Sequence, residues 1–173
     1  MTIKQSFPPV IHDDAKILVL GSMPGEASLR QQQYYAHPQN LFWKILLSIG
    51  SEQLADFSYA DKLSLLKQQK VALWDVLKHC ERQGSLDSNI IAASEQANDL
   101  LTLLGDHPHI DKICFNGKKA FQSFQKHLLK PYPEFFQQYE LIVLPSTSPA
   151  NASISAAVKY QQWITEVWDR PRA

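Results

Sequence analysis

The segment YYAHPQNLFWK, residues 34–44, holds side chains whose types and spacing could do chemistry. Tyr34 and Tyr35 stand in a polar stretch, where aromatic rings often stack on nucleic-acid bases, although they could equally pack over the loop. Pro38 is typical of the first turn of a helix, which places Asn40 near the positive end of the helix dipole. The Asn40 amide oxygen could there hold a water molecule by accepting one of its hydrogens. A local helix cap is the alternative role for this side chain.

Three further segments combine turn-forming residues with hydrogen-bonding groups. The sequence GSMPG at residues 21–25 allows a tight turn and a close approach of the backbone to a ligand. It matches neither a Walker loop nor a GxGxxG motif, and a plain turn is the alternative. Asn116 and Gly117 follow a short apolar run, where they suit a turn or a side chain that contacts a ligand. The sequence STS at residues 146–148 could bind a phosphate through hydroxyl and backbone N–H groups, or form a polar loop before a helix.

The composition limits the classes of protein to consider. The chain has 173 residues, which predicts one domain over residues 1–173, and its 45% hydrophobic and 20% charged residues are ordinary for a globular protein. The formal net charge is zero, which argues against a highly basic coat protein for nucleic acid. Cys80 and Cys114 are too few for a four-cysteine iron–sulfur cluster, an all-cysteine zinc site or a disulfide framework. The sequence has no apolar secretory signal and no apolar run of membrane-spanning length, so we expect a cytoplasmic location.

The spacing of the apolar residues alternates between that of strands and that of helices. The predicted strands are residues 16–20, 71–77, 113–115 and 141–144, and the predicted helices are residues 42–49, 59–69, 94–105, 121–128 and 158–168. A polar loop with three glutamines follows GSMPG. The alternation favours an α/β fold whose parallel sheet is covered by helices on both faces. Sites in this fold class form in the loops after the carboxyl ends of the strands.

These segments together resemble the uracil-DNA glycosylase superfamily. In its mismatch-specific uracil-DNA glycosylases, a Gly-x-Asn-Pro-Gly loop is followed by an aromatic residue and Ala-His-Pro-x-Asn-x-Phe-Trp. This chain has GSMPG and then YAHPQNLFW at residues 35–43. The sequence LPSTSPAN, residues 144–151, is similar to the second motif of the superfamily, His-Pro-Ser-Pro or Asn-Pro-Ser-Gly. The resemblance covers about residues 17–151 and implies a three-layer α/β/α sandwich with a central four-stranded parallel sheet.

Departures from the uracil enzymes indicate one branch of this superfamily. Met23 stands where those enzymes have a catalytic asparagine, and a methionine cannot orient water. Trp74 stands where they have the asparagine that reads uracil, and Asn116 precedes Gly117 where they often have a tryptophan. The set GSMPG, AHPQN and FNG is similar to the hypoxanthine-DNA glycosylase branch, which removes deaminated adenine. In that branch the asparagine of the AHPxN segment is held to be catalytic, and it corresponds to Asn40.

The resemblance implies a DNA repair enzyme that flips a nucleotide into a pocket, cleaves its glycosidic bond by water attack at C1′ and leaves an abasic site. No lysine stands in a motif that suggests a Schiff base, which favours a monofunctional enzyme. The implied roles are catalysis for Asn40, base binding for Ser22, Met23, Tyr35 and Asn116, and DNA binding for Ser146, Thr147, Ser148 and Asn151. Asn116 suits hypoxanthine because an amide donates to O6 and accepts from N1–H, whereas adenine presents the reverse pattern. Asp75 could assist as a base, with a strand-end cap or an ion pair as the alternative.

Two other functions remain open from the sequence. One is a glycosylase for uracil or another deaminated base such as xanthine. The other is a noncatalytic DNA- or nucleotide-binding module with the same fold, which Met23 favours and Asn40 disfavours. We expect no cofactor and no metal site, since the histidines are scattered. We also expect DNA with a deaminated base as the partner, no membrane association and a monomer.

Overall fold

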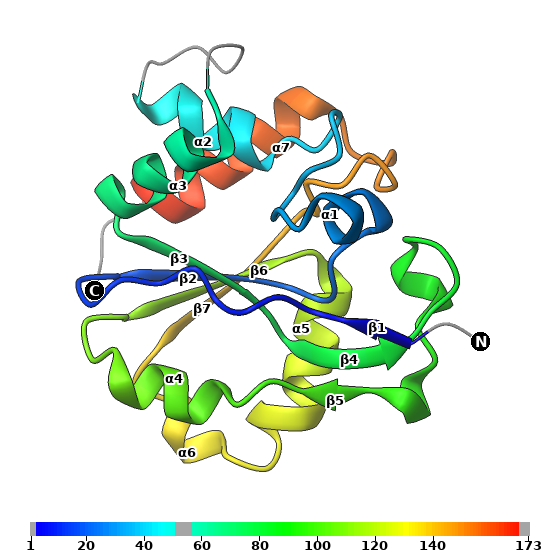
Figure 1. Ribbon diagram of the computed structural model, residues 1–173. Helices are drawn as coiled ribbons and strands as arrows, with labels where there is room; N and C mark the ends of the chain where they lie inside the picture. The colour runs from blue at the N-terminus through cyan, green and yellow to red at the C-terminus, as the bar shows by residue number, and fades with distance from the viewer. Residues whose placement is uncertain (1–2, 51–56, 170–173) are drawn as a thin grey trace.

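A four-stranded parallel sheet lies at the centre of the computed structural model, which describes residues 3–50 and 57–169 (Figure 1). Its strands are β2 (Ile17–Gly21), β3 (Val71–Asp75), β6 (Lys112–Asn116) and β7 (Glu140–Leu144). They lie in the order β3-β2-β6-β7, and all three pairings are parallel. The α/β class and the four-stranded parallel sheet predicted from the sequence are therefore confirmed.

The central strand β2 explains why both faces of the sheet need a cover. All five of its residues are buried, as expected for a strand in the middle of a parallel sheet. Successive side chains of a strand point to opposite faces, so Ile17 and Val19 enter one hydrophobic core and Leu18 and Leu20 enter the other. Two separate cores around one sheet require a three-layer arrangement.

Helices form the outer layers of this sandwich, and Figure 1 shows them above and below the sheet. The upper layer holds α2 (Phe42–Gly50), α3 (Tyr59–Gln68) and α7 (Ala156–Trp163), which continues as the π-helical segment η5 (Ile164–Asp169). The lower layer holds α4 (Leu100–Asp106), α5 (Lys118–Phe124) with its π-helical continuation η4 (Gln125–Leu129), and α6 (Pro133–Phe136). The predicted α/β/α sandwich is thus confirmed.

A second, antiparallel sheet was not expected from the sequence. It consists of β1 (Ile3–Gln5), β4 (Leu77–Glu81) and β5 (Gln96–Ala97) in the order β1-β4-β5. The single strand predicted over residues 71–77 is wrong, because β3 ends at Asp75 and β4 begins at Leu77. The Val76 and Leu77 N–H groups donate to the carbonyls of Gly21 and Ser22, and the chain then leaves the parallel sheet.

Two helix predictions also need correction. The helix predicted to begin at Ser94 begins at Leu100 instead, because the Asp99 side chain caps it by accepting from the Thr102 N–H. Before that cap, residues 92–94 form the 3-10 turn η3 (Ala92–Ser94) and residues 96–97 pair with β4. The polar segment after GSMPG, predicted as a loop, contains the short helix α1 (Glu26–Gln31).

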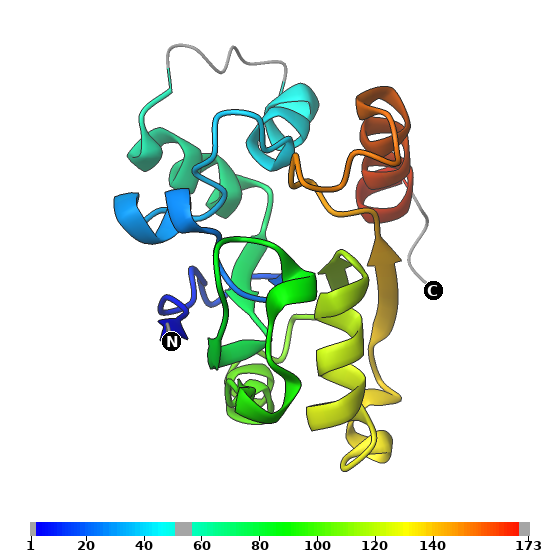
Figure 2. The same cartoon turned by 90° about the vertical axis from the view of Figure 1, so that its right-hand side faces the viewer.

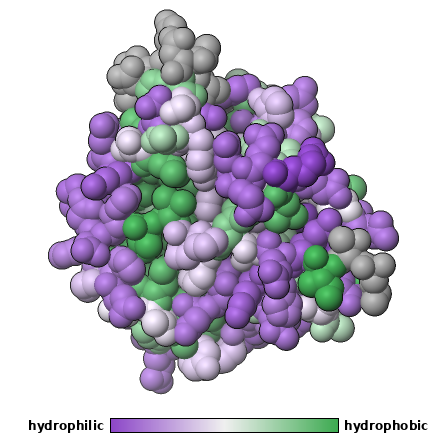
Figure 3. Space-filling model, viewed as in Figure 1, coloured by the Kyte–Doolittle hydropathy of each residue, from purple (hydrophilic) through white to green (hydrophobic). Residues whose placement is uncertain are grey.

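The surface mixes polar and apolar residues. On the face in Figure 3, apolar patches are separated by hydrophilic residues. Within the described residues, no helix combines the length and the apolar character needed to cross a membrane.

Candidate active site

A pocket of about 890 Å³ opens at the carboxyl ends of the parallel strands. Figure 2 faces the side on which the loops after these strands, α1 and the 3-10 turn η2 (Asp87–Asn89) gather. The structure brings all of the predicted site residues to this pocket, which are Ser22, Met23, Tyr35, Asn40, Asn116, Ser146, Thr147, Ser148 and Asn151. Residues more than 120 positions apart in the sequence therefore share one cavity, as the α/β class predicts.

Three neighbouring strand ends form a row at the base of this pocket. Gly21 of β2 is in register with Asp75 of β3, and on its other side β2 pairs with the strand that ends at Asn116. Gly21 leaves room between its two neighbours, because a Cβ atom at this position would come within 2.6 Å of Asp75 Oδ1. The structure thus places a carboxyl and an amide on either side of a glycine. Trp74, the expected counterpart of the uracil-reading asparagine, does not line the pocket, and its ring N–H donates to the Phe7 carbonyl instead.

The Asn116 side chain is buried and is fixed by Thr147. Asn116 Oδ1 accepts from the Thr147 backbone N–H at 2.9 Å, and Asn116 Nδ2 donates to Thr147 Oγ1 at 3.0 Å. A backbone N–H can only donate, so the oxygen of the amide must face it, and this sets the orientation of the whole group. One N–H hydrogen and one oxygen lone pair remain for a ligand. Thr147 is itself only 1% exposed and both of its polar groups contact Asn116, while its expected contact with phosphate stays a prediction.

Of the two tyrosines in the polar loop, only Tyr35 lies as a base-stacking residue would. Tyr34 is a core residue, because it is 4% exposed and its hydroxyl donates to the Pro8 carbonyl. One face of Tyr35 packs against the Phe42 ring, with centroids 4.5 Å apart. Tyr35 also has a left-handed backbone with φ of 54°, which costs a non-glycine residue free energy, and of the three such residues described only Tyr35 lines the pocket. We interpret this backbone as the means that brings the ring to the pocket.

Asn40 lies in the pocket wall just before helix α2. The helix predicted to begin near Pro38 begins at Phe42, so Asn40 precedes the first turn and does not belong to it. Asn40 Oδ1 accepts from the Phe42 N–H at 3.0 Å, which is the local capping role considered above. A carbonyl oxygen has two lone pairs, so this bond leaves one for a water molecule.

The GSMPG loop is held by residues that sequence reasoning missed. Ser22 Oγ donates to Asp87 Oδ1 at 2.6 Å, and Arg82 Nη2 donates to the Pro24 carbonyl at 2.6 Å. Arg82 is 1% exposed and also donates from Nε to the Gly84 carbonyl. The segment around Arg82 and Asp87 reads as an ordinary polar loop, and no local pattern marks these contacts.

The loop of residues 145–151 is organised by its own hydroxyls and by a buried lysine. The Ser146 and Ser148 side chains each accept from a backbone N–H two residues ahead, which leaves both hydroxyl hydrogens free to be donated. The Asn151 amide contacts the Ser146 carbonyl and Ser153. Lys159 Nζ donates to the carbonyls of Ser148 and Asn151, and its burial lowers the pKa of this ammonium group.

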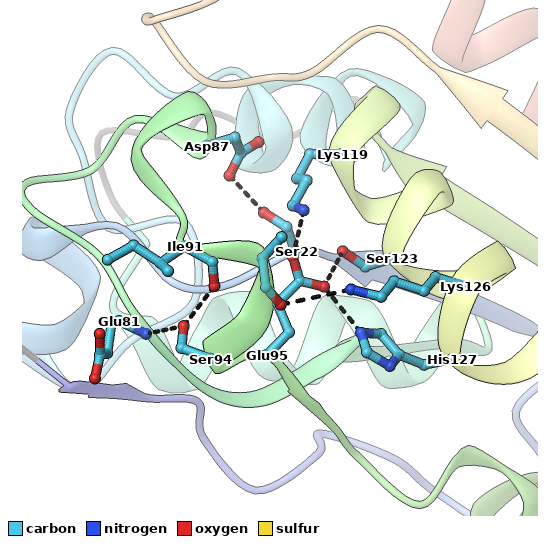
Figure 4. A network of polar contacts seen from close by, with 11 residues as sticks. Ser22, Glu81, Asp87, Ile91, Ser94, Glu95, Lys119, Ser123, Lys126 and His127 are labelled. Carbon is cyan, nitrogen blue, oxygen red and sulfur yellow. Dashed lines mark hydrogen bonds and ion pairs between the residues drawn. The ribbon is translucent and has the colours of Figure 1, made fainter.

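A buried polar network supports the opposite wall of the pocket (Figure 4). The Glu95 carboxylate is 1% exposed and accepts from Lys119 Nζ, Ser123 Oγ and His127. Burial alone would raise the pKa of Glu95, but the hydrogen bonds from Lys119 and His127 outweigh it and the net pKa is lowered. Lys119 lines the pocket, so this network positions a cation at its edge.

The acidic groups at the base of the pocket are shifted toward their neutral forms. Burial, with a smaller contribution from Asp87, raises the pKa of Asp75 to about 7, and Arg82 lowers it only in part. Burial also raises the pKa of Asp87, against the hydrogen bond from Ser22. The pKa of Tyr35 is raised by burial and by Asp75, whereas the nearby Asn116 amide lowers it. Among the described residues, no cluster of three or more His, Cys, Asp or Glu side chains is placed to hold a metal ion.

Gly117→Ala is expected to destabilise the fold. Gly117 has φ of 100° and ψ of 163°, a conformation almost restricted to glycine, and a Cβ there would lie 3.1 Å from Ser146 Cβ. The expected loss is about 1–3 kcal/mol in the free energy of unfolding, measured by urea denaturation. Gly105→Ala is the matched control, because nothing lies within 4 Å of its Cβ position and alanine favours a helix. Equal stability of the two variants would contradict this account.

Comparison with known proteins gives a consistent result. Residues 8–171 match the family described as the uracil DNA glycosylase superfamily. Two relatives named hypoxanthine DNA glycosylase are similar. The one from Methanosarcina acetivorans is 42% identical over 88% of this chain and 91% of its own length, and the one from Methanosarcina barkeri is 40% identical over 86% and 88%.

The fold is also similar to that of a solved structure. It is a solution NMR structure from Methanosarcina acetivorans, provisionally described as a uracil DNA glycosylase, with a TM-score of 0.78 and 39% identity over 95% of this chain and 96% of that one. The sequence match over nearly the whole chain, the shared fold and the pocket at the strand ends agree. The chain belongs to the uracil DNA glycosylase superfamily.

Proposed function

We propose that this protein is a DNA glycosylase that excises hypoxanthine, the deamination product of adenine. The flipped nucleotide enters the pocket, water attacks C1′, and the base leaves an abasic site in the strand. DNA that contains a deaminated base is the partner, and the proposal includes action as a monomer in the cytoplasm.

The oriented amide of Asn116 is the observation that carries the choice of a deaminated base over adenine. Its remaining N–H faces an acceptor and its remaining lone pair faces a donor, which hypoxanthine presents as O6 and N1–H. Adenine presents a donor and an acceptor in the opposite order. The Thr147 N–H prevents the amide from turning over to accommodate adenine, because Nδ2 would then face this N–H and two donors would meet without an acceptor.

The other residues have roles that follow from their positions. The Tyr35 ring stacks on the flipped base, and the Ser22–Met23 backbone approaches it from the neighbouring loop. Asn40 holds the attacking water through the second lone pair of its oxygen. It thereby takes the role of the catalytic asparagine of the uracil enzymes, at whose position this chain has Met23. Ser146 and Ser148 donate their hydroxyl hydrogens to phosphate oxygens, with Asn151 shaping that loop.

Uracil is the second candidate substrate for a specific reason. Its O4 and N3–H form the same acceptor and donor pair as O6 and N1–H of hypoxanthine, so Asn116 by itself would accept either base. Discrimination between the two must come from a contact with the larger purine.

The test is a panel of duplexes with one deoxyinosine, uracil, xanthine or ethenoadenine, incubated with enzyme and a chelator and then treated with alkali. We expect inosine strands to be cut well above uracil strands, and no cutting without alkali because the enzyme is monofunctional. Uracil excision equal to or faster than inosine excision would overturn the substrate. No excision of any lesion would favour a noncatalytic DNA-binding module.

A further inference from the structure

The Asp75 carboxyl is a buried polar group of the pocket that the proposed mechanism does not use. Asp75 is 4% exposed and lines the pocket, and its Oδ2 has no hydrogen-bond partner among the described residues. A buried oxygen without a partner costs free energy, and proteins keep such groups where a ligand or an ordered water completes them. A strand-end cap or an ion pair, the roles considered from the sequence, would have given Oδ2 a partner.

Burial and the charged groups around Asp75 keep a substantial fraction of its carboxyl in the neutral form near pH 7. Asp87 of η2 disfavours its ionisation, and Arg82, which follows β4, favours ionisation but donates from Nε and Nη2 to the carbonyls of Gly84 and Pro24. Tyr34 and Tyr35 also interact with Asp75, and the pKa of each hydroxyl is raised by burial and, to a smaller extent, by Asp75. With a pKa of about 7, raised mainly by burial, the carboxyl retains a proton that Oδ2 can donate.

The row of strand ends matches the order of polar groups around a purine. Asn116, Gly21 and Asp75 follow one another across the base of the pocket. Hypoxanthine carries N1–H, O6 and N7 in sequence around its rings, with N1–H and O6 on the Watson–Crick edge and N7 on the adjacent Hoogsteen edge. With N1–H and O6 at Asn116, the base extends toward Gly21, which has no side chain of its own and over which Asp75 Oδ1 and the Tyr35 hydroxyl lie, and N7 faces Asp75. Uracil has a C–H group in the corresponding direction and offers no acceptor there.

We propose that Asp75, as the neutral acid, donates a hydrogen bond from Oδ2 to N7 of the flipped purine, and that this contact favours hypoxanthine over uracil. The proposal rests on the proposed function. When the C1′–N9 bond breaks, its electron pair stays on the base and is shared with N7, while water supplies the new oxygen at C1′. A hydrogen bond to N7 therefore strengthens as the base departs, which is the condition for catalysis.

The test combines a variant with a substrate analogue. Single-turnover excision is measured for the wild type, Asp75→Ala and Asp75→Asn, on duplexes with deoxyinosine or 7-deaza-deoxyinosine, in which a C–H group replaces N7. We expect Asp75→Ala to lose about tenfold to hundredfold on deoxyinosine, the scale of one buried hydrogen bond, and less than about threefold on the analogue. The rate of each variant is divided by the wild-type rate on the same substrate. This cancels the difference in glycosidic-bond strength between the two substrates.

Asp75→Asn separates hydrogen bonding from charge, because its amide donates at every pH. The wild type loses its donor as the pH rises through about 7, so the excision rate of Asp75→Asn relative to the wild type should rise about tenfold per pH unit above 7.

The thermal stability of the same samples is a readout independent of excision. A raised carboxyl pKa adds stability at low pH that is lost between about pH 4, the unfolded value, and pH 7. Asp75→Asn should lack this loss.

The outcomes distinguish this proposal from the proposed function. If the wild type excises inosine but Asp75→Ala stays within threefold of it, or loses as much on the analogue, the N7 contact is refuted and the function stands. A pH-independent ratio of Asp75→Asn to the wild type would refute it equally. If the wild type excises no inosine, the proposed function fails and this contact fails with it.

Discussion

Asn40→Ala is expected to lower single-turnover excision of inosine by roughly 10²-fold or more, the scale for the loss of one positioned catalytic group. Asn40 lines the pocket, and its oxygen retains one lone pair for the attacking water after capping α2. Binding of inosine DNA, measured by fluorescence anisotropy, should change little because base and phosphate contacts remain. Near wild-type chemistry in this variant would remove Asn40 from the mechanism.

Loss of the cap must be separated from loss of the water contact. Removing the cap costs about 1 kcal/mol, which lowers the melting temperature by about 2–4 °C for a chain of this size. Ser58→Ala is the matched control, because Ser58 caps α3 by accepting from the Asp61 N–H and does not line the pocket. This variant should lose similar stability and keep its excision rate. Asn40→Asp retains an oxygen for both the cap and the water, so it should be much more active than Asn40→Ala.

Asn116→Asp is expected to reduce inosine excision at least about tenfold to hundredfold. The substitution keeps the size of the side chain but replaces the donor that faces O6 with an oxygen. An unmatched buried polar pair costs about 1–3 kcal/mol, and a charged group costs more. About 1.4 kcal/mol corresponds to a factor of ten in rate. The measurement is single-turnover excision beside thermal unfolding of the same preparation.

The surroundings of Asn116 predict that the fold will tolerate this change. The Thr147 N–H can still donate to the carboxylate, and the Thr147 hydroxyl, now an acceptor, can rotate to donate its hydrogen. We therefore expect the melting temperature to shift by only a few degrees. Thr147→Ser keeps both contacts and should excise inosine at close to the wild-type rate. Full activity of Asn116→Asp would refute base reading, and a collapsed melting temperature would indicate a structural role.

The elements that the sequence predicted well are those set by local patterns. The run of residues 17–20 is apolar throughout, as expected for a strand such as β2 that is buried on both faces. The elements it predicted wrongly depend on distant contacts. β4 separates from β3 because Val76 and Leu77 bond to the loop after β2, and residues 96–97 form a strand only because β4 lies beside them. A pattern of apolar residues contains no information on such partners.

The sequence by itself determined the fold class, the family and the nine predicted site residues that meet in the pocket, because strand periodicity and short motifs are properties of neighbouring residues. The tertiary structure alone decided how those residues are used. It paired Thr147 with Asn116, set Tyr35 on Phe42, and left the Asp75 carboxyl buried beside Gly21 without a partner for Oδ2. Burial, the orientation of an amide and the pKa of a carboxyl depend on atoms brought together from distant parts of the chain, and these exist only once the sheet has formed.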